Sequence, residues 1–271
     1  MMYRTLLATC YLFITAVLSP LFAETLVLGG TGTDLGTFRL LADAFRENHP
    51  HVEITILPSM GSSGGFKALK HQKISLALTS RPLKNSERSS EIKAIHYAST
   101  PLVMAVSIKS PKQDVTRDQV NQIYTGKLKQ WPDGSPARPI LRPSQDSDTK
   151  ILINTLAKCE QCFIQAYHRR GIPVALTDQE SADMIVRVPG AIGTSTLALI
   201  LSEKKPIKAL NLDGIAPTIE NLQNKTYPMY KELYLVYNKN HNMQSLDAFV
   251  NFIYSEKGQS ILLNTGHLTI K

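Results

Sequence analysis

The sequence has no long apolar run after its first 23 residues, no dense basic segment, and only two cysteines beyond that point. About 20 consecutive apolar residues are needed to span a bilayer, so no membrane-crossing helix is expected after residue 23. The lysines and arginines are scattered without a run of five or more, which argues against a nucleic-acid-binding arm. The formal net charge is nevertheless +8, and a basic balance of this kind also suits an anionic small ligand.

The two late cysteines, Cys159 and Cys162, form the motif C-E-Q-C. In an exported protein such a pair can be a small disulfide, and the alternative is a redox-active C-x-x-C. The strand and the Trp-Cys context of a thioredoxin-like motif are absent, and a metal site would need two more ligands that no nearby residue offers. We therefore expect no metal and no cofactor, and the state of the pair stays open.

The first 23 residues have the pattern of a secretory signal peptide, with Arg4 in the charged segment, an apolar core at 6–22 and Ala23 at the cleavage point. Leu21 stands where the A-x-A cleavage pattern usually has a small residue, so this position is a weak match. An uncleaved anchor is the alternative, but the apolar run is short and no stop-transfer pattern follows. Cys10 precedes most of the apolar core, which disfavours a lipoprotein. Removing 23 residues with their single arginine from 271 leaves 248 with a net charge of +7, enough for one large domain or two lobes.

A glycine-rich turn follows a strand predicted at 25–28, and the rest of the chain is organised around it. Asp34 or Thr37 is expected to cap the helix that comes next. The apolar residues of that helix recur at helical spacing and predict one buried face: Phe38, Leu41, Ala42 and Phe45.

Backbone N–H groups at such a helix N-terminus suit an anion. The motif Gly30-x-Gly32-x-x-x-Gly36 nevertheless departs from the dinucleotide fingerprint, and it lacks the lysine of a P-loop. A tight strand-to-helix turn without any ligand is equally consistent with these residues.

Strand-like and helix-like segments alternate along the chain, which predicts an α/β fold with largely parallel sheets. The predicted strands are 25–28, 52–57, 74–78, 102–108, 140–141 and 233–237. The predicted helices are 66–73, 116–124 with an N-cap at Thr116, 150–157, 181–186, 246–254 and 258–263.

In such folds ligands bind beyond the carboxyl ends of the strands. Four polar loops fall there, at 30–37, 59–65, 79–81 and 142–149, and the seven histidines lie outside them. These loops offer hydroxyls, N–H donors and arginines but no catalytic base, which are the groups expected in an oxyanion receptor. An exported hydrolase is the weakest of the interpretations, because no nucleophile–base pair is visible.

Short motifs then occur in a fixed order over nearly the whole mature chain. They are residues 30–33, 61–65 with Lys67, 80–83, 123–127 with Trp131, Arg142 with Ser147 and Thr149, 190–193, and Tyr227 with Pro228. This ordered series resembles the periplasmic phosphate-binding proteins of phosphate ABC transporters, within the type II periplasmic solute-binding family.

The resemblance implies two Rossmann-like lobes joined by two crossover segments, lobe 1 at 24–104 and 227–271 and lobe 2 at 105–226, which close like a hinge. It further implies a periplasmic monomer that binds phosphate or a similar oxyanion and delivers it to an ABC transporter permease, with no enzymatic activity and no nucleic-acid partner. The ligand-binding residues that it implies are Gly32, Thr33, Asp34, Ser62, Ser63, Arg81, Arg142, Ser147, Asp148 and Thr149.

The chain departs from the family pattern at two positions, Arg81 in place of an aspartate and Asp148 in place of a glycine. An extra arginine favours a fully ionised oxyanion, whereas an acid at 148, near Asp34 and Asp146, repels one unless it is paired with arginine. The identity of the ligand is therefore open, and an exported sensor or scaffold that acts through a protein partner is the alternative. Asp148 could instead be a helix N-cap, with the helix beginning at Thr149.

Overall fold

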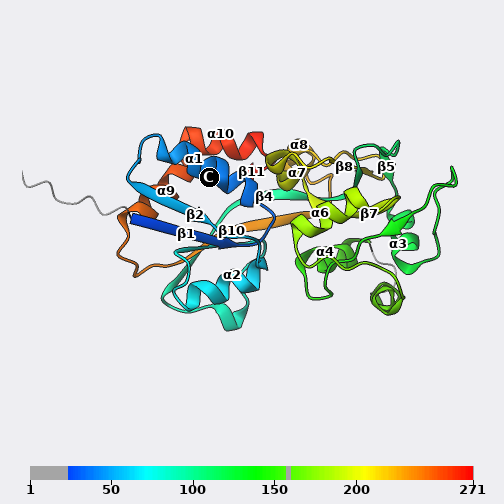
Figure 1. Ribbon diagram of the computed structural model, residues 1–271, viewed down its shortest axis with the longest axis horizontal. Helices are drawn as coiled ribbons and strands as arrows, with labels where there is room; N and C mark the ends of the chain where they lie inside the picture. The colour runs from blue at the N-terminus through cyan, green and yellow to red at the C-terminus, as the bar shows by residue number, and fades with distance from the viewer. Residues whose placement is uncertain (1–23, 157–159, 271) are drawn as a thin grey trace, which may run out of the picture.

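The computed structural model describes residues 24–156 and 160–270. The predicted signal peptide and Cys159 lie outside the described residues. Within them, no helix combines the length and the apolarity that crossing a membrane requires. The molecule is elongated, with one lobe at each end of its long axis (Figure 1).

The strands are β1 (Glu24–Gly30), β2 (Val52–Ile56), β3 (Leu76–Thr79), β4 (Ile92–Ser107), β5 (Asp114–Val115), β6 (Arg138–Pro139), β7 (Ala191–Thr196), β8 (Ile207–Ala209), β9 (Asn211–Leu212), β10 (Tyr230–Asn238) and β11 (Leu268–Thr269). The α-helices are α1 (Leu35–Arg46), α2 (Gly61–Lys70), α3 (Arg117–Thr125), α4 (Ser147–Leu156), α5 (Glu160–Ile164), α6 (Asp178–Arg187), α7 (Leu197–Glu203), α8 (Ile219–Gln223), α9 (Gln244–Ile253) and α10 (Glu256–Asn264). Two short 3₁₀ helices are η1 (Asn85–Glu87) and η2 (Gln165–His168).

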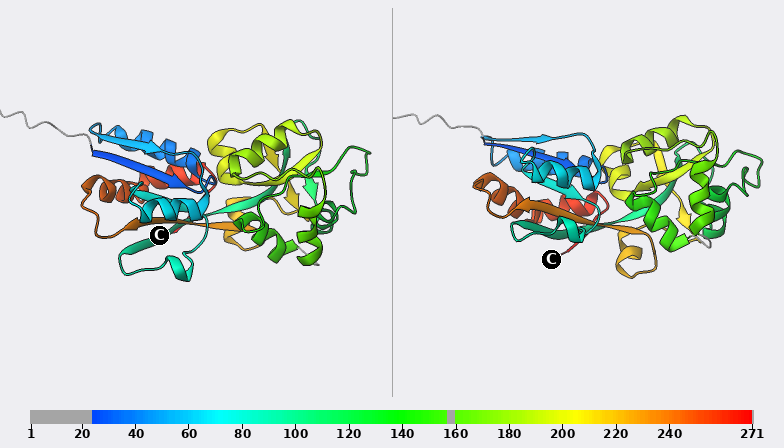
Figure 2. Two further views of the ribbon diagram at one scale, coloured as in Figure 1. Left: turned by 60° about the horizontal axis from the view of Figure 1, so that its bottom comes forward. Right: turned by 90° about the horizontal axis from the view of Figure 1, so that it is seen from below.

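The two lobes are joined by β4 and by the chain that enters β10. Strand β4 has 16 residues; it pairs with β10 as far as Pro101 and with β7 from Leu102 onward, so one strand belongs to the sheets of both lobes. Figure 2 shows β4 and β10 running between the lobes in two further views. The predicted two-lobed α/β fold with two crossover segments is confirmed.

The sheet order is β2-β1-β3-β10-β4-β7-β6, with β8 and β11 also paired to β4. Strands β1, β2 and β3 are parallel as predicted. The expectation of largely parallel sheets is wrong overall, because β10 is antiparallel to β3 and β4, and β7, β8 and β11 are antiparallel to β4. The cause is the topology, since the chain returns to lobe 1 alongside the strand by which it left.

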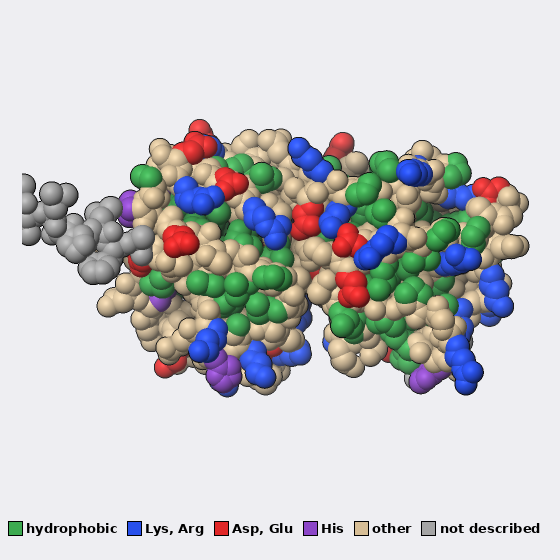
Figure 3. Space-filling model, in the orientation of Figure 1, with side chains coloured by type: hydrophobic (Ala, Val, Ile, Leu, Met, Phe, Trp, Pro, Cys, Tyr) green, Lys and Arg blue, Asp and Glu red, His purple; other side chains and the backbone are tan. Residues whose placement is uncertain are grey.

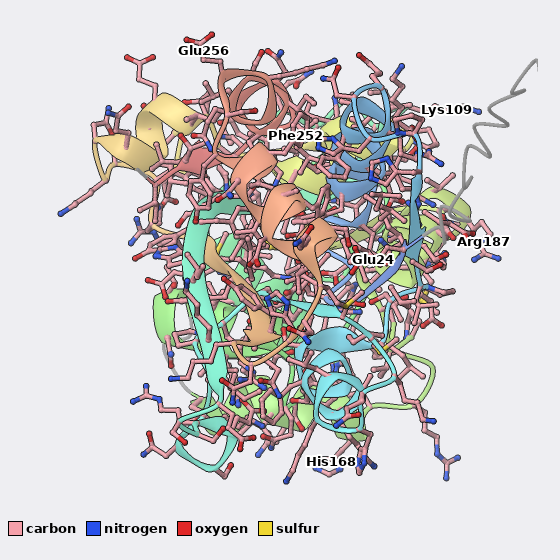
Figure 4. The ribbon with its side chains drawn as sticks, turned by 90° about the vertical axis from the view of Figure 1, so that its left-hand side faces the viewer. Glu24, Lys109, His168, Arg187, Phe252 and Glu256 are labelled. Carbon is pink, nitrogen blue, oxygen red and sulfur yellow. The ribbon has the colours of Figure 1, made fainter. Side chains whose placement is uncertain are left out.

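Lobe 1 packs α1 and α9 on one face of its sheet, where Phe38 contacts both Tyr97 and Phe249 edge to face. Figure 4 views this lobe along the long axis, with Glu24 at the start of β1 and Phe252 on α9. The helix face predicted from apolar spacing in α1 is buried in this core. Helix α2 covers the other face of the sheet, over a smaller apolar cluster.

Two helices near the cleft begin earlier than the sequence predicts. Helix α2 begins at Gly61, so the glycine-rich segment expected to be a loop is its first turn. Helix α4 begins at Ser147. Glycine has a low helix propensity, but a Cβ on Gly65 would lie 2.6 Å from the Cα atom of Gly30, so the approach of α2 to β1 requires glycine there.

The lobes also touch beside the crossover strands, where α1 of lobe 1 packs against α7 of lobe 2 (Figure 1). A Cβ on Gly36 would lie 2.4 Å from the Oγ atom of Ser202, which shows how closely the two helices approach. The side-chain amide of Gln179 donates to the carbonyl of Gly32 at 2.8 Å across the same junction. The lobes are thus in direct contact on the α1 side of the crossover strands.

Candidate functional site

A cleft of about 580 Å³ lies between the lobes. Its walls come from the segment that opens α2 and the loop after β3 in lobe 1, from one side of α4 and the start of α6 in lobe 2, and from the start of β10. In the space-filling view the surface is hollowed between the two lobes at its lower edge (Figure 3). The cleft is therefore bounded by segments that are far apart in the chain.

Four hydroxyls from both lobes meet at one point of the cleft, and we call them the hydroxyl cluster. Ser80 Oγ is at the centre, 3.1 Å from Thr31 Oγ1, 3.2 Å from Ser62 Oγ and 3.4 Å from Ser147 Oγ. Thr31, Ser62 and Ser80 belong to lobe 1, and Ser147 opens α4 in lobe 2. A hydroxyl both donates and accepts, so this cluster can turn its donors toward an oxyanion.

The ends of two parallel strands bring the lobe 1 hydroxyls together. Ser80 directly follows β3, and its backbone N–H donates to Ser62 Oγ at 2.9 Å. Thr31 follows β1 and donates its N–H to the carbonyl of Leu78 at 2.9 Å. Gly30 turns the chain there with φ at +142°, a conformation that side chains rarely adopt. The carboxyl ends of neighbouring parallel strands thus supply the cluster, as expected for this fold class.

A buried lysine lies behind the hydroxyl cluster. Lys231, on β10, is 1 % exposed, and its Nζ atom is 2.5 Å from Asp148 Oδ1 and 3.0 Å from Asp178 Oδ1. It also donates to Thr33 Oγ1 at 3.0 Å, which connects the turn before α1 to lobe 2. Burial opposes the charge of Lys231, but Asp148 and Asp178 raise its pKa above the ordinary lysine value.

Arg142 is buried beside the same carboxylates. Its guanidinium lies 3.0 Å from Asp146 and 3.8 Å from both Asp148 and Asp178, and it donates to the carbonyl of Ala175 at 3.1 Å. Burial alone would lower the pKa of Arg142, but the three carboxylates raise it above its ordinary value. We call Arg142, Lys231 and these three aspartates the ion network.

The ion network contains three carboxylates and two cations. The pKa values of Asp146 and Asp178 are shifted in opposite directions. Burial, followed by the charge of Asp148, raises the pKa of Asp146 to about 6. Burial would also raise the pKa of Asp178, but Lys231 and Arg142 outweigh it and hold that pKa below its ordinary value. An anion that reaches this part of the cleft therefore meets cations that the protein's own carboxylates already neutralise.

Asp34 lies behind the cleft, and burial raises its pKa to about 7. It occupies the N-cap position of α1, as one of the two predictions had it, but its side chain makes no capping hydrogen bond. Its carboxyl instead accepts a hydrogen bond from the hydroxyl of Tyr97. The predicted capping role of this side chain is thus wrong, because Tyr97 on β4 takes the carboxyl into the core.

Arg81 lies at the rim of the cleft and is already paired. Its guanidinium donates to both carboxylate oxygens of Glu87 at 2.7 and 2.8 Å, and to Ser63 Oγ at 3.0 Å. This hydrogen bonding lowers the pKa of Glu87. The extra arginine seen in the sequence therefore adds less positive charge to the cleft than expected.

A family model described as a PBP superfamily domain matches residues 20–257. The chain belongs to the PBP superfamily. Among curated relatives, it is 24 % identical over 222 residues to the phosphate-binding protein PstS of Borreliella burgdorferi, covering 79 % of this chain and 78 % of that protein. It is 24 % identical over 256 residues to the protein SphX of Synechococcus elongatus, covering 85 % and 73 %.

Among solved structures, the chain is similar to a putative phosphate ABC transporter substrate-binding protein with bound phosphate from Clostridium perfringens. The TM-score is 0.77 at 22 % identity, over 92 % of this chain and 100 % of that one. At this identity the comparison establishes the shared fold. The type II arrangement of two lobes, expected from the resemblance, is thereby confirmed for this PBP superfamily member.

The structure divides the ten residues predicted to bind a ligand into two groups of five. Those that line the cleft of this PBP superfamily member are Ser62, Ser63, Arg81, Arg142 and Ser147. Those that lie outside its lining are Gly32, Thr33, Asp34, Asp148 and Thr149. Contact of any of the ten with a ligand stays a prediction.

The residues outside the lining have other partners, and two of them stand on α4. Asp148 lies in the first turn of α4, after its start at Ser147, so its interpretation as the N-cap is wrong. Its carboxylate turns inward to Lys231, and Asp146 Oδ1 accepts from its backbone N–H at 2.9 Å instead. Thr149 donates its hydroxyl to the carbonyl of Arg142 at 3.1 Å.

Sequence reasoning missed Lys231 and Asp178. Lys231 stands in the segment Y-K-E-L-Y-L-V-Y, where a lysine before an apolar run looks like a solvent-facing strand residue. Its alternation with the buried Leu233 and Leu235 is the signal that places it on the inner face. Within the described residues, no three His, Cys, Asp or Glu side chains are placed to hold a metal ion.

Proposed function

We propose that this PBP superfamily protein is an exported receptor that binds phosphate, or a closely similar tetrahedral oxyanion, in the cleft between its lobes. It then delivers the ion to an ABC transporter permease. The names of the curated relatives and the phosphate bound in the Clostridium perfringens structure support phosphate as the ligand. We also propose that the protein is periplasmic and monomeric, with the signal peptide predicted at residues 1–23 removed.

One observation carries the proposal, namely that the hydroxyl cluster is built by both lobes. Ser80 and Ser147 approach to 3.4 Å across the cleft, so an ion held by one of them is within reach of the other. Neutral donors matter here, because the guanidinium of Arg142 is neutralised by its own aspartates. An oxyanion gains hydrogen bonds from both lobes at once, and it thereby favours their closure.

The carboxylates of the cleft favour a ligand that carries a proton. Asp146 and Asp178 line the cleft and are acceptors when ionised. Hydrogen phosphate can donate its proton to such an oxygen, whereas sulfate at neutral pH has no proton and is repelled. We therefore propose that the site binds phosphate in preference to sulfate.

We propose that residues 24–104 with 227–271 and residues 105–226 move as the two units of this hinge. The long strand β4 and the segment entering β10 at Tyr230 are the connections about which they turn. A receptor role rather than catalysis fits the lining of the cleft, which includes no histidine and no cysteine among the residues that the structure describes.

Isothermal titration calorimetry of the mature protein with phosphate and with sulfate at pH 7.5 tests the proposal. We expect saturable binding of phosphate and much weaker binding of sulfate. Ser80→Ala should weaken phosphate binding by about 1–2 kcal/mol, roughly tenfold, because it removes the hydroxyl at the centre of the cluster. Ser90→Ala is the matched control, since Ser90 is exposed and lies outside the cleft lining.

Absence of phosphate binding at millimolar concentration would contradict the proposal and favour the sensor or scaffold alternative. Equal binding of phosphate and sulfate would contradict the role of the carboxylates. Small-angle X-ray scattering with and without phosphate measures closure, and an unchanged radius of gyration would argue against a hinge.

A further inference from the structure

The cleft is much larger than an inorganic oxyanion needs. Four oxygens, each given a water's share of about 30 Å³, require on the order of 100 Å³. The cleft measures about 580 Å³, within the size range of sites for organic ligands. The hydroxyl cluster therefore accounts for only a small part of the space.

The unused space lies outside the hydroxyl cluster. The innermost parts of the lining are buried, as at Ser80, Arg142 and Lys231. The two lobes already meet there, because Ser80 and Ser147 are 3.4 Å apart and Lys231 links Thr33 to Asp178. The inner end of the cleft is therefore already closed in this structure, and the space that the lobes enclose lies outward of it.

The outer part of the cleft is lined by exposed apolar side chains from both lobes. Met60, Leu176 and Tyr230 line it and are 36 %, 69 % and 43 % exposed. Leu176 is the most exposed large hydrophobic residue in the part of the chain that the structure describes. Large apolar side chains gathered at the entrance of a polar site are typical of a binding surface.

Two lysines complete this outer surface. Lys84 and Lys150 line the cleft from opposite lobes, both exposed, and no ion pair is formed by either among the described residues. They add positive charge where an anionic ligand enters, at a position that the ion network does not neutralise. The half-buried Glu232 beside Tyr230 is also in the lining, so the two lysines outnumber it and the outer part of the cleft combines apolar contact with attraction for an anion.

We infer that the cleft accepts monosubstituted phosphoryl compounds, either phosphonates or phosphate monoesters. The phosphoryl group binds at the hydroxyl cluster, and the organic substituent packs against Met60, Leu176 and Tyr230. This inference rests on the proposed function, because it places the oxyanion at the same cluster. It adds a second subsite that selects for an apolar group of several carbon atoms.

Calorimetric titration with inorganic phosphate, methylphosphonate, butylphosphonate and phenylphosphonate tests the inference. Phenylphosphonate should bind about tenfold or more tightly than methylphosphonate, since a phenyl ring buries enough apolar area for such a gain. Leu176→Ser should remove most of that gain and change the affinity for inorganic phosphate less than about twofold. Tyr230→Ser should also remove most of that gain. Ile108→Ser is the matched control, because Ile108 is 56 % exposed and lies outside the cleft lining.

The outcomes separate the two proposals. If inorganic phosphate binds but the substituted compounds bind no better than methylphosphonate, the outer subsite is refuted and the receptor function stands. If none of the four compounds binds, both are refuted. Circular dichroism of each variant shows whether it is folded, and the two serine variants lie on different elements, so a folding failure in one leaves the other as the test.

Discussion

The Nζ atom of Lys231 on crossover strand β10 lies 2.5 Å from Oδ1 of Asp148 on lobe 2 helix α4, and both side chains are 1 % exposed. A buried ion pair contributes modestly compared with an apolar pair of similar shape, but removing one partner leaves an uncompensated buried charge. This pair therefore ties lobe 2 to the strand by which the chain returns to lobe 1. Loss of this pair should lower the free energy of unfolding more clearly than it changes the affinity for a ligand.

Replacing Lys231 with methionine, which keeps the length and removes the charge, should destabilise the protein by about 3–5 kcal/mol. Asp148 and Asp178 are then left with only Arg142 at 3.8 Å. Urea unfolding at pH 7 measures the loss. The double variant Lys231→Met, Asp148→Asn should regain part of it, and an unchanged urea midpoint in the single variant would contradict the pairing.

Asp34 should make stability depend on pH. Its pKa is about 7 in the folded protein and 3.8 ordinarily, so between these values the folded state holds a proton that the unfolded chain has released. The contribution of Asp34 to the free energy of unfolding therefore falls as pH rises from about 4 to about 7. Asp34→Asn keeps an acceptor for Tyr97 and removes the titration.

Relative to Asp34→Asn, the unmodified protein should lose on the order of 4 kcal/mol of unfolding free energy across that pH window. Urea unfolding of both proteins at pH 4, 5.5, 7 and 8 provides the comparison. A difference that stays constant with pH would show that this carboxyl is ionised throughout.

Two adjacent glycines in α2 should respond unequally to alanine. A Cβ at Gly65 would lie 2.6 Å from the backbone of Gly30, so Gly65→Ala should cost about 1–3 kcal/mol through overpacking. At Gly64 the nearest atoms are Cβ and Cγ of Met60 at 3.1 and 3.2 Å, a milder crowding that offsets the higher helix propensity of alanine, so Gly64→Ala should change stability by less than about 1 kcal/mol. Thermal unfolding of the two variants tests this prediction. Equal melting temperatures would count against the close packing of α2 on β1.

Arg142→Gln should destabilise the protein. The substitution leaves Asp146, Asp148 and Asp178 with Lys231 as their nearest cation, so the cost in stability should be several kcal/mol at pH 8. It should be smaller at pH 5, because the pKa of Asp146 is about 6 and protonation removes one of the three charges. A cost that is independent of pH, measured by urea unfolding, would mean that Asp146 does not titrate in this range.

Much of the fold could be predicted from the sequence, because its elements follow local patterns. The N-cap at Thr116 is confirmed, since its hydroxyl accepts from the N–H of Gln119. The first 10 residues of β4 could not be predicted, because Ile92–Pro101 reads as a mixture of polar and apolar residues that only the pairing with β10 makes a strand. Tertiary contacts decide strand formation more than intrinsic propensity does.

The cleft was harder to predict than the loops that form it. Ser62, Arg142 and Ser147 were found because they stand in short motifs with recognisable donors. Lys231 and Asp178 were missed because their function is visible only when two segments 53 residues apart meet in a buried pair. Local sequence shows which groups a loop offers, and it does not show which other charges will neutralise them.

The 16-residue strand β4 has a consequence for how the molecule can be divided. Its Ile92–Pro101 part pairs with β10 in the sheet of lobe 1, and the part from Leu102 lies between β7 and β8 in the sheet of lobe 2. Cutting the chain within β4, or expressing either half by itself, deprives one hydrophobic core of a strand whose side chains are buried in it. Genetic dissection into separately folded halves should fail, whereas circular permutation in an exposed loop keeps the strand whole and should be tolerated.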